Sequence, residues 1–255
     1  MKKNKYQNLR HWNMVMFFLH AAQAIIMYVV SSEFALPLTT SFVEFNPQEM
    51  VLAPSLEEVT TLRIGPLVSG FLAFSAIAHL AVSLPGVYEW YVKNLKKGAN
   101  YARWIEYSFS SSLMIVVIAM LTGMYDIFGL LLMFSLNAMM ILFGWMMELH
   151  NQTTKKTNWT SYIFGCIAGV IPWIVIAAYL AFAGEGDYKA PTFVYWIFFS
   201  MFIFFNTFAV NMVLQYKEVG KWKDYTYGEK MYIILSLVAK TLLAWQVWSG
   251  TLRPL

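Results

Sequence analysis

The sequence predicts an all-α membrane protein built as one bundle of seven transmembrane helices, and two observations lead to this fold class. Of the 255 residues, 59% are hydrophobic and only 13% are charged, whereas soluble proteins carry about 25% charged residues. Seven stretches are also long and apolar enough to cross a bilayer, which takes about 20 residues. They leave no room for a second folded module, so we expect residues 1–255 to form a single domain.

Each apolar stretch is predicted to be a helix. Backbone groups in lipid must find their hydrogen bonds within the segment, and no stretch shows the period-two alternation of a barrel strand. The predicted spans cover residues 12–31, 63–84, 101–122, 125–147, 160–183, 193–215 and 230–251.

The distribution of Lys and Arg predicts the orientation of the bundle. Three basic residues (Arg63, Lys189 and Arg253) fall on one side of the membrane, and Lys240 lies inside a span. Fourteen fall on the other side: Lys2, Lys3, Lys5, Arg10, Lys93, Lys96, Lys97, Arg103, Lys155, Lys156, Lys217, Lys221, Lys223 and Lys230. The positive-inside rule makes the richer side cytoplasmic. We therefore expect a multi-pass cell-membrane protein with its amino terminus inside and its carboxy terminus outside. The net charge of +4 reports this orientation and not a nucleic-acid partner.

The longest connection, residues 32–61, falls on the predicted external side. It has acidic residues but no Lys or Arg before Arg63. Its Phe, Val, Thr and Pro content favours a short β-hairpin, which we expect to lie as a lid over the outer face of the bundle.

Lys240 is the most informative residue, because ionisable groups within spans are costly and usually functional. It follows Lys230 by ten residues, which places it about 15 Å deep, too far to reach the interface easily. Glu106 enters the third span from the same side and lies about 12 Å deep. The matching depths predict an ion pair between Lys240 and Glu106.

Three interpretations of this pair are open. It could be a structural salt bridge between helices, or the coupling site of a transporter. Alternatively, a desolvated lysine is nucleophilic and can form an imine with an aldehyde cofactor. The protonated imine would be a buried cation that requires a nearby carboxylate, which Glu106 supplies. No enzymatic activity is expected.

The residues predicted around the pair suit a long, thin chromophore. In the third span, Glu106, Ser110 and Met114 share one helix face at i, i+4 and i+8. A single aromatic residue in such a position usually belongs to ordinary core packing and not to a cofactor site. Here several aromatic residues are expected around one buried lysine, which favours a cofactor site. The further candidates are Tyr107, Ser111, Asn137, Ile141, Gly169, Trp173, Phe198, Phe202, Phe205, Asn206 and Ser236.

At this point the sequence shows a family resemblance. Seven helices with a lysine midway along the seventh look like a retinal-binding rhodopsin, and the predicted cytoplasmic amino terminus resembles the heliorhodopsins. The matching stretches are RWIEYS at 103–108, ILFGW at 141–145, FGCIAG at 164–169 leading to Pro172 and Trp173, FFN at 204–206, GKW at 220–222 and SLVAK at 236–240. The similarity covers nearly the whole chain.

The resemblance implies that Lys240 binds all-trans retinal as a protonated Schiff base, with Glu106 as its single counterion. Light would isomerise the retinal to 13-cis and start a slow photocycle. Ser236 stands where pumps of this fold have a second carboxylate. A homodimer is implied too, since heliorhodopsins commonly pair.

Proton pumping is not expected. Val117 occupies the position of the donor carboxylate of outward pumps, and no acidic residue occurs from 108 to 123. The predicted cytoplasmic half is more polar, because His20, Gln23, Ser75 and His79 lie at a depth similar to that of Glu106. One of the two histidines could accept the proton of the imine, or the group could form a hydrated pocket. A zinc site is a weaker alternative, since the helix spacing of zinc hydrolases is absent.

We therefore expect a light sensor that signals without pumping ions. A light-gated proton channel and a transporter are the alternatives. Lysines in the loops around 93–97 and 217–223 could dock an unknown cytoplasmic partner.

Overall fold

The computed structural model describes residues 5–184 and 189–252. It confirms seven helices long and apolar enough to span a membrane. In chain order they are α1 (Lys5–Val30), α2 (Ile64–Ala81), α4 (Tyr101–Leu121), α5 (Ile127–Asn151), α6 (Thr160–Phe182), α7 (Thr192–Tyr216) and α8 (Tyr225–Val247). Lys2, Lys3 and Arg253 of the charge count lie outside the described residues.

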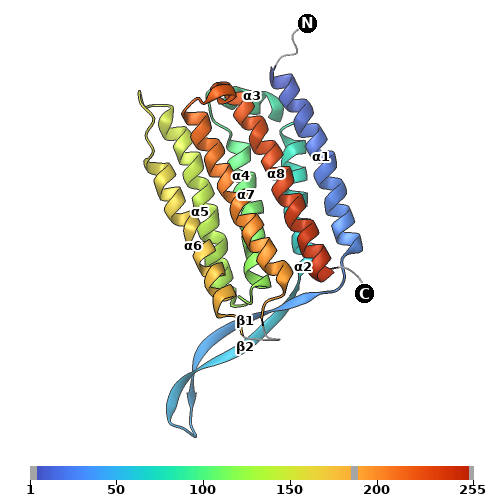
Figure 1. Cartoon of the computed structure of the whole chain (residues 1–255), viewed down its shortest axis with the longest axis vertical. Helices are drawn as coiled ribbons and strands as arrows, with labels where there is room; N and C mark the ends of the chain where they lie inside the picture. Colours follow the sequence, from blue (N-terminus) through green and yellow to red (C-terminus); the bar gives the residue numbers. More distant parts are fainter. Residues whose placement is uncertain (1–4, 185–188, 253–255) are drawn as a thin grey trace.

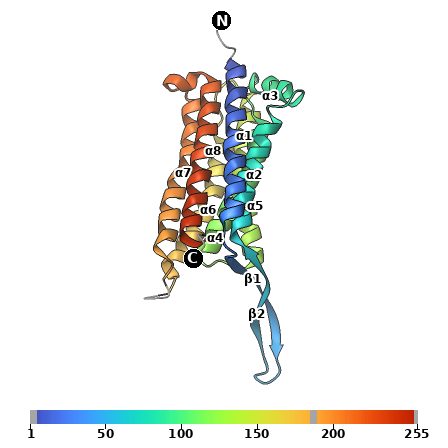
Figure 2. The same ribbon diagram turned by 90° about the vertical axis from the view of Figure 1, so that its right-hand side faces the viewer.

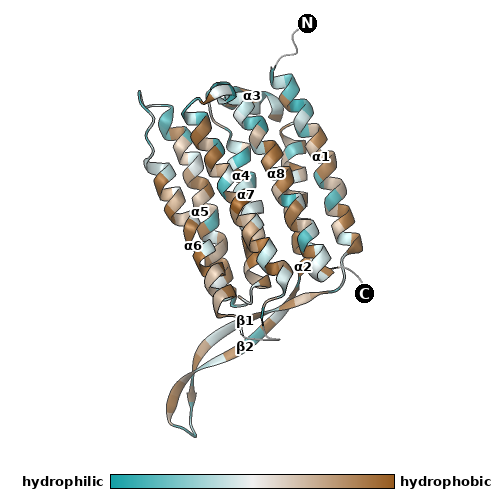
Figure 3. Ribbon diagram, in the orientation of Figure 1, coloured by the Kyte–Doolittle hydropathy of each residue, from teal (hydrophilic) through white to brown (hydrophobic). Residues whose placement is uncertain are grey.

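The seven helices run side by side with α4 in the interior (Figures 1 and 2). A short helix, α3 (Val87–Leu95), and a 3-10 turn, η2 (Gly220–Lys223), lie at the end of the bundle near the N-terminus. A π-helical turn, η3 (Trp248–Leu252), extends α8 at the other end. Hydrophobic residues predominate along the helices, as Figure 3 shows, which fits their predicted contact with lipid.

Several helices extend beyond the predicted spans at the N-terminal end of the bundle. Helix α1 begins at Lys5 instead of residue 12, and α8 begins at Tyr225 instead of residue 230. Asp224 caps α8 by accepting a hydrogen bond from the amide of Thr226 at 3.1 Å, and it forms an ion pair with Lys5 at 3.2 Å. Polar contacts of this kind stabilise helical turns beyond the apolar stretch. Hydropathy detects only the apolar stretch, so it underestimates the length of these helices.

The predicted hairpin is present, but it is longer than expected, and only its base lies over the outer face of the bundle. Strands β1 (Ala35–Asn46) and β2 (Val51–Arg63) pair antiparallel from Ala35–Arg63 to Asn46–Val51. The base of the hairpin covers part of the bundle's outer end, where Leu36, Leu38 and Leu62 pack against the core. Strands of this length reach about 40 Å, and the rest of the hairpin projects past the end of the bundle (Figures 1 and 2). Its base is tied to the bundle where the amide of Thr39 donates to the carbonyl of Tyr125 at 2.9 Å.

The two halves of the bundle differ in polarity. The half nearer the hairpin holds a core of aliphatic and aromatic side chains from α2, α4, α6, α7 and α8, among them Phe71, Ile118, Ile176, Ile197 and Leu243. The half nearer the N-terminus contains buried polar and charged residues, including His20, Arg103, Glu148 and Glu229. The chemistry of the bundle is therefore concentrated in the N-terminal half.

Candidate functional site

The amine of Lys240 is held by three side chains from three helices. Its Nζ lies 2.7 Å from Oε1 of Glu106 on α4, 2.6 Å from Oγ of Ser75 on α2, and 3.0 Å from Oγ of Ser236, one turn earlier on α8. The hydroxyl of Ser75 also donates to Glu106 at 2.7 Å. The predicted ion pair is thus present, and Ser75 connects its two members.

Burial makes this arrangement chemically significant. The side chains of Lys240 and Glu106 are 4% and 8% exposed. A buried charge requires both a partner and hydrogen bonds, and here two hydroxyls supply the hydrogen bonds. The ring of Tyr107 adds a cation–π contact, with its centroid 5.2 Å from Nζ.

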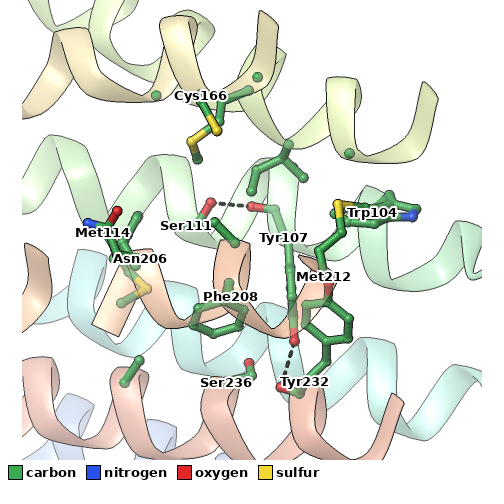
Figure 4. Close-up of a pocket in the computed structure, with 18 of the residues that line it drawn as sticks. Trp104, Tyr107, Ser111, Met114, Cys166, Asn206, Phe208, Met212, Tyr232 and Ser236 are labelled. Atoms are coloured by element: carbon green, nitrogen blue, oxygen red, sulfur yellow. Dashed lines mark hydrogen bonds between the residues drawn. The ribbon is translucent and has the colours of Figure 1, made fainter. Parts of the chain in front are cut away.

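A cavity of about 230 Å³ is lined by Lys240 and by other residues of α4, α5, α6, α7 and α8 (Figure 4). Its wall is mostly apolar and aromatic. Of the predicted candidates, the residues on this wall are Tyr107, Ser110, Ser111, Met114, Ile141, Gly169, Trp173, Phe202, Phe205, Asn206 and Ser236. The structure therefore brings most of the predicted chromophore contacts to one cavity.

The aromatic wall is built around Trp173. Its ring packs edge-on against Phe202 and Phe205, with centroids 5.4 and 5.3 Å away. Phe198, another predicted contact, packs against Trp173 at 5.8 Å but does not line the cavity. Such edge-to-face contacts hold aromatic rings in fixed orientations. This end of the cavity is accordingly shaped for a ring or a conjugated chain.

Asn137 does not lie on the cavity wall, although it was a predicted contact. Its Nδ2 donates to Ser111 at 2.9 Å and to Ser112 at 3.1 Å. Ser111 in turn donates to the carbonyl of Tyr107 at 2.6 Å (Figure 4). Asn137 thus supports the wall from behind, because a buried amide in an apolar span seeks hydrogen-bond partners on a neighbouring helix.

Sequence reasoning missed part of the wall. Phe208 and Met212 follow Phe205 at i+3 and i+7, so helical spacing could have identified them. Trp104 and Gly144 meet across α4 and α5, where a Cβ on Gly144 would lie 2.5 Å from the Trp104 ring. No local sequence pattern predicts this close approach of the two helices. The other missed residues are Met140, Tyr162, Gly165, Cys166, Val170, Ala209, Tyr232 and Ala239.

A second cavity, of about 40 Å³, lies on the N-terminal side of the ion pair. Its lining includes Asn13, His79, Tyr91, Glu106 and Glu229. Burial, and next the charge of Glu229, raises the pKa of the Tyr91 phenol above its ordinary value, so Tyr91 remains neutral. This polar cavity shares Glu106 with the lysine site.

The predicted polar group is only partly assembled. His79 lines the small cavity, and Ser75 contacts Lys240 directly. His20 stacks on His79 with ring centroids 5.5 Å apart, and neither of its ring nitrogens has a hydrogen-bond partner among the described residues. Gln23 instead donates to the carbonyl of Leu19 on its own helix at 3.3 Å. Within residues 5–184 and 189–252, no three metal-binding side chains converge.

A buried charge cluster was not predicted. Arg103, counted above with the basic residues of a connection, is 4% exposed in its side chain and forms ion pairs with Glu148 and Glu229. Glu148 also accepts hydrogen bonds from the indole of Trp104 at 2.6 Å and from the amide of Asn100 at 2.8 Å. The acidic residues Glu148 and Glu229, which lie near the ends of two spans, were the sequence feature that could have revealed this cluster. The cluster ties α4, α5 and α8 together.

Comparison with solved structures places the fold among the microbial rhodopsins. A light-driven proton pump from Leptosphaeria maculans has a TM-score of 0.65 and 13% identity, with 98% of this chain and 96% of that chain covered. The transmembrane domain and linker region of a Salpingoeca rosetta rhodopsin phosphodiesterase has a TM-score of 0.67 and 12% identity, with 97% and 71% covered. At these identities the likeness shows the fold alone.

The sequence itself gives a narrower result. No functionally curated protein matches the chain, but the heliorhodopsin family model matches residues 9–252. Members of this family are retinal-binding, light-responsive membrane proteins, and the cavity beside Lys240 has the amine and the apolar, aromatic lining that retinal requires. The chain belongs to the heliorhodopsin family.

Proposed function

We propose that the protein is a light sensor that carries all-trans retinal on Nζ of Lys240, with Glu106 as the single counter-charge. One observation carries the proposal: the buried Lys240–Glu106 pair, with N–O distance 2.7 Å, stands at a cavity lined by aromatic side chains. When bound there, retinal supplies absorption of visible light and a light-driven change from all-trans to 13-cis. Side chains of the protein stabilise the charge at Nζ and accept the proton that leaves it.

The side chains around Lys240 hold and redirect one proton. In the resting protein, Glu106, Ser75 and Ser236 stabilise a positive charge at Nζ. A proton that leaves Nζ has polar neighbours on the N-terminal side, where the small cavity lies. Toward the hairpin the packed core is apolar. We infer that the proton stays within the N-terminal half and returns slowly, so no ion is pumped.

Signalling is proposed to occur at the N-terminal end of the bundle, which the distribution of Lys and Arg makes cytoplasmic. Lys93 and Lys96 at α3, and Lys221 and Lys223 in η2, are the basic residues that we propose dock an acidic cytoplasmic partner. The protein would act as a homodimer without an enzymatic activity of its own. Slower or faster hydrogen exchange in these two segments on illumination supports the docking proposal, and identical exchange contradicts it.

Ion transport is the decisive comparison. Cells or liposomes that contain the retinal-loaded protein should show light-induced absorbance changes but no sustained photocurrent under voltage clamp. A sustained current carried by protons would instead establish the light-gated channel, with the cavity beside His79 and Glu106 as part of its path. Light-driven transport against a gradient would establish a pump.

A further inference from the structure

We propose that Asn13 is a positioning residue that fixes the tautomer of His79, so that Nε2 of His79 takes the proton that leaves Lys240. The proposal rests on the proposed function for the origin of that proton. Asn13 lies on α1, is 2% exposed, and was not among the residues expected from the sequence. Its side chain makes two hydrogen bonds that together determine its orientation.

The first bond orients the amide group. Nδ2 of Asn13 donates to the carbonyl oxygen of Leu9 on the same helix at 3.0 Å. A carbonyl oxygen only accepts, so the NH₂ group must face Leu9. The opposite orientation would place two oxygens against each other.

The second bond transmits that orientation to the imidazole. Oδ1 of Asn13 lies 2.7 Å from Nδ1 of His79. An amide oxygen has no hydrogen to give, so Nδ1 of His79 must carry the N–H. A neutral imidazole has one N–H, and its Nε2 therefore keeps a free lone pair. The Leu9–Asn13–His79 chain thus leaves His79 with its basic nitrogen at Nε2.

The surroundings of His79 supply a route for the proton. His79 and Glu106 line the same cavity of about 40 Å³, enough for roughly two or three waters. The ionisable groups near this ring are His20 on α1, Glu106 on α4 and Lys240 on α8. The same cavity is also lined by Tyr91 of α3, by Arg103 and Tyr107 of α4, and by Glu229 and Tyr232 of α8. His20 does not line this cavity, so His79 is the better-placed histidine.

The transfer is a simple proton movement. The N–H bond at Nζ of Lys240 breaks and Nζ keeps the electron pair, while the lone pair of Nε2 of His79 forms a new N–H bond through the cavity water. Both nitrogens of His79 then carry hydrogen. Oδ1 of Asn13 still accepts from Nδ1, so the same bond stabilises the imidazolium that results.

Asn13→Leu tests the inference, because leucine has a similar size but no acceptor. We expect the ¹⁵N chemical shifts of His79, measured first in the retinal-free protein, to lose the pure Nδ1–H signature. The chain has four histidines, and His79→Gln assigns the signal. In the retinal-loaded protein, the near-ultraviolet absorption that reports loss of the Nζ proton should rise about tenfold more slowly, a smaller loss than removal of a catalytic base causes.

Two variants serve as controls. Asn94 on α3 makes the same bond to its own helix, with Nδ2 donating to the Trp90 carbonyl at 3.0 Å, but faces the exposed surface. Asn94→Leu should therefore change neither readout. Asn13→Asp keeps an acceptor oxygen for Nδ1 and should retain the Nδ1–H tautomer. In a His79→Gln background, Asn13→Leu should have no further effect on the rate.

The outcomes separate the inference from the proposed function. An unchanged His79 signature in Asn13→Leu, or an equal rate effect in the presence and absence of His79, would overturn the role of Asn13. If Asn13→Leu does not fold, Asn13→Asp decides, since loss of the Nδ1–H signature in that variant contradicts the proposal. If the wild-type chain forms no pigment, the proposed function fails, while the tautomer in the retinal-free protein remains measurable.

Discussion

Nζ of Lys240 lies 2.7 Å from Oε1 of Glu106, and this pair joins α8 to α4 in the interior of the bundle. Each charge alone would be strongly unfavourable in this environment. Together, and with the hydroxyl of Ser75 bonded to both, they form a satisfied unit. The same unit is ready to stabilise a cation on Nζ, so one contact explains both the stability of the site and its proposed use.

Removing the charge of Glu106 should abolish the visible absorption at neutral pH. In Glu106→Gln the neutral amide no longer stabilises a positive charge on Nζ, so we expect the pigment to absorb in the near ultraviolet. Glu106→Asp keeps the charge and should keep a visible band. Absorption spectra of the two retinal-loaded variants check this, and an unshifted visible band in Glu106→Gln would show that another group provides the counter-charge.

Gly144 should tolerate no side chain, because a Cβ there would lie 2.5 Å from the Trp104 ring. We expect Gly144→Ala to lower the free energy of unfolding by about 1–3 kcal/mol through overpacking and to slow retinal uptake. Gly70 is the matched helical control, since its Cβ would meet Leu113 at an ordinary 3.4 Å. Gly70→Ala should be neutral or stabilising by up to about 1 kcal/mol. Thermal unfolding that affects both variants equally would argue against the close contact.

The Arg103 cluster should contribute much more to stability than an exposed ion pair. Arg103→Gln leaves Glu148 and Glu229 buried without a cation, which we expect to cost about 3–5 kcal/mol. The Lys5–Asp224 pair has side chains 54% and 49% exposed, so Lys5→Ala should change stability by less than about 1 kcal/mol. Unfolding measured in the same detergent compares them. A mild effect of Arg103→Gln would mean that the cluster is hydrated or that one carboxyl is protonated.

The outer part of the hairpin should be dispensable for the pigment. Beyond Phe42 the strands are largely exposed, and the described attachment to the bundle lies near Thr39 and Tyr125. Replacing residues 43–54 with a two-residue Asn-Gly turn should preserve the retinal absorption band and the rate of retinal uptake, because Asn-Gly favours a tight hairpin. A large change in the rate of retinal uptake would show that the outer part of the hairpin controls access to the bundle.

Much of the fold follows from the sequence, because hydropathy over about 20 residues fixes where helices can cross a membrane. The depth of Lys240 and Glu106 then fixes their pairing, since both are measured from the same side along nearly straight helices. The hairpin was located, but its length and its projection beyond the bundle were not predicted, because no residue pattern specifies its angle to the bundle. Arg103 was misassigned because counting charges near helix ends does not distinguish a solvated arginine from a buried one.

The supporting residues were the least predictable part of the site. Asn13 acts through one hydrogen bond to a neighbouring helix and Asn137 through two. Such bonds depend on the rotation of each helix about its axis, which sequence periodicity does not fix closely. Glu229 lies only five residues after the α8 cap, where a charged residue normally reaches water. Its burial arises from contacts with Asn100 and Arg103, which are far away in sequence.

The proposed function requires that Lys240 carry retinal beside Glu106. Its most direct test is the absorption spectrum of the purified protein after addition of all-trans retinal, for wild type and for Lys240→Ala. We expect a visible band in the wild type that hydroxylamine bleaches in light, and no such band in Lys240→Ala. A folded wild-type protein without a visible band, or an equal band in both proteins, would contradict the claim and leave Lys240–Glu106 as a structural ion pair.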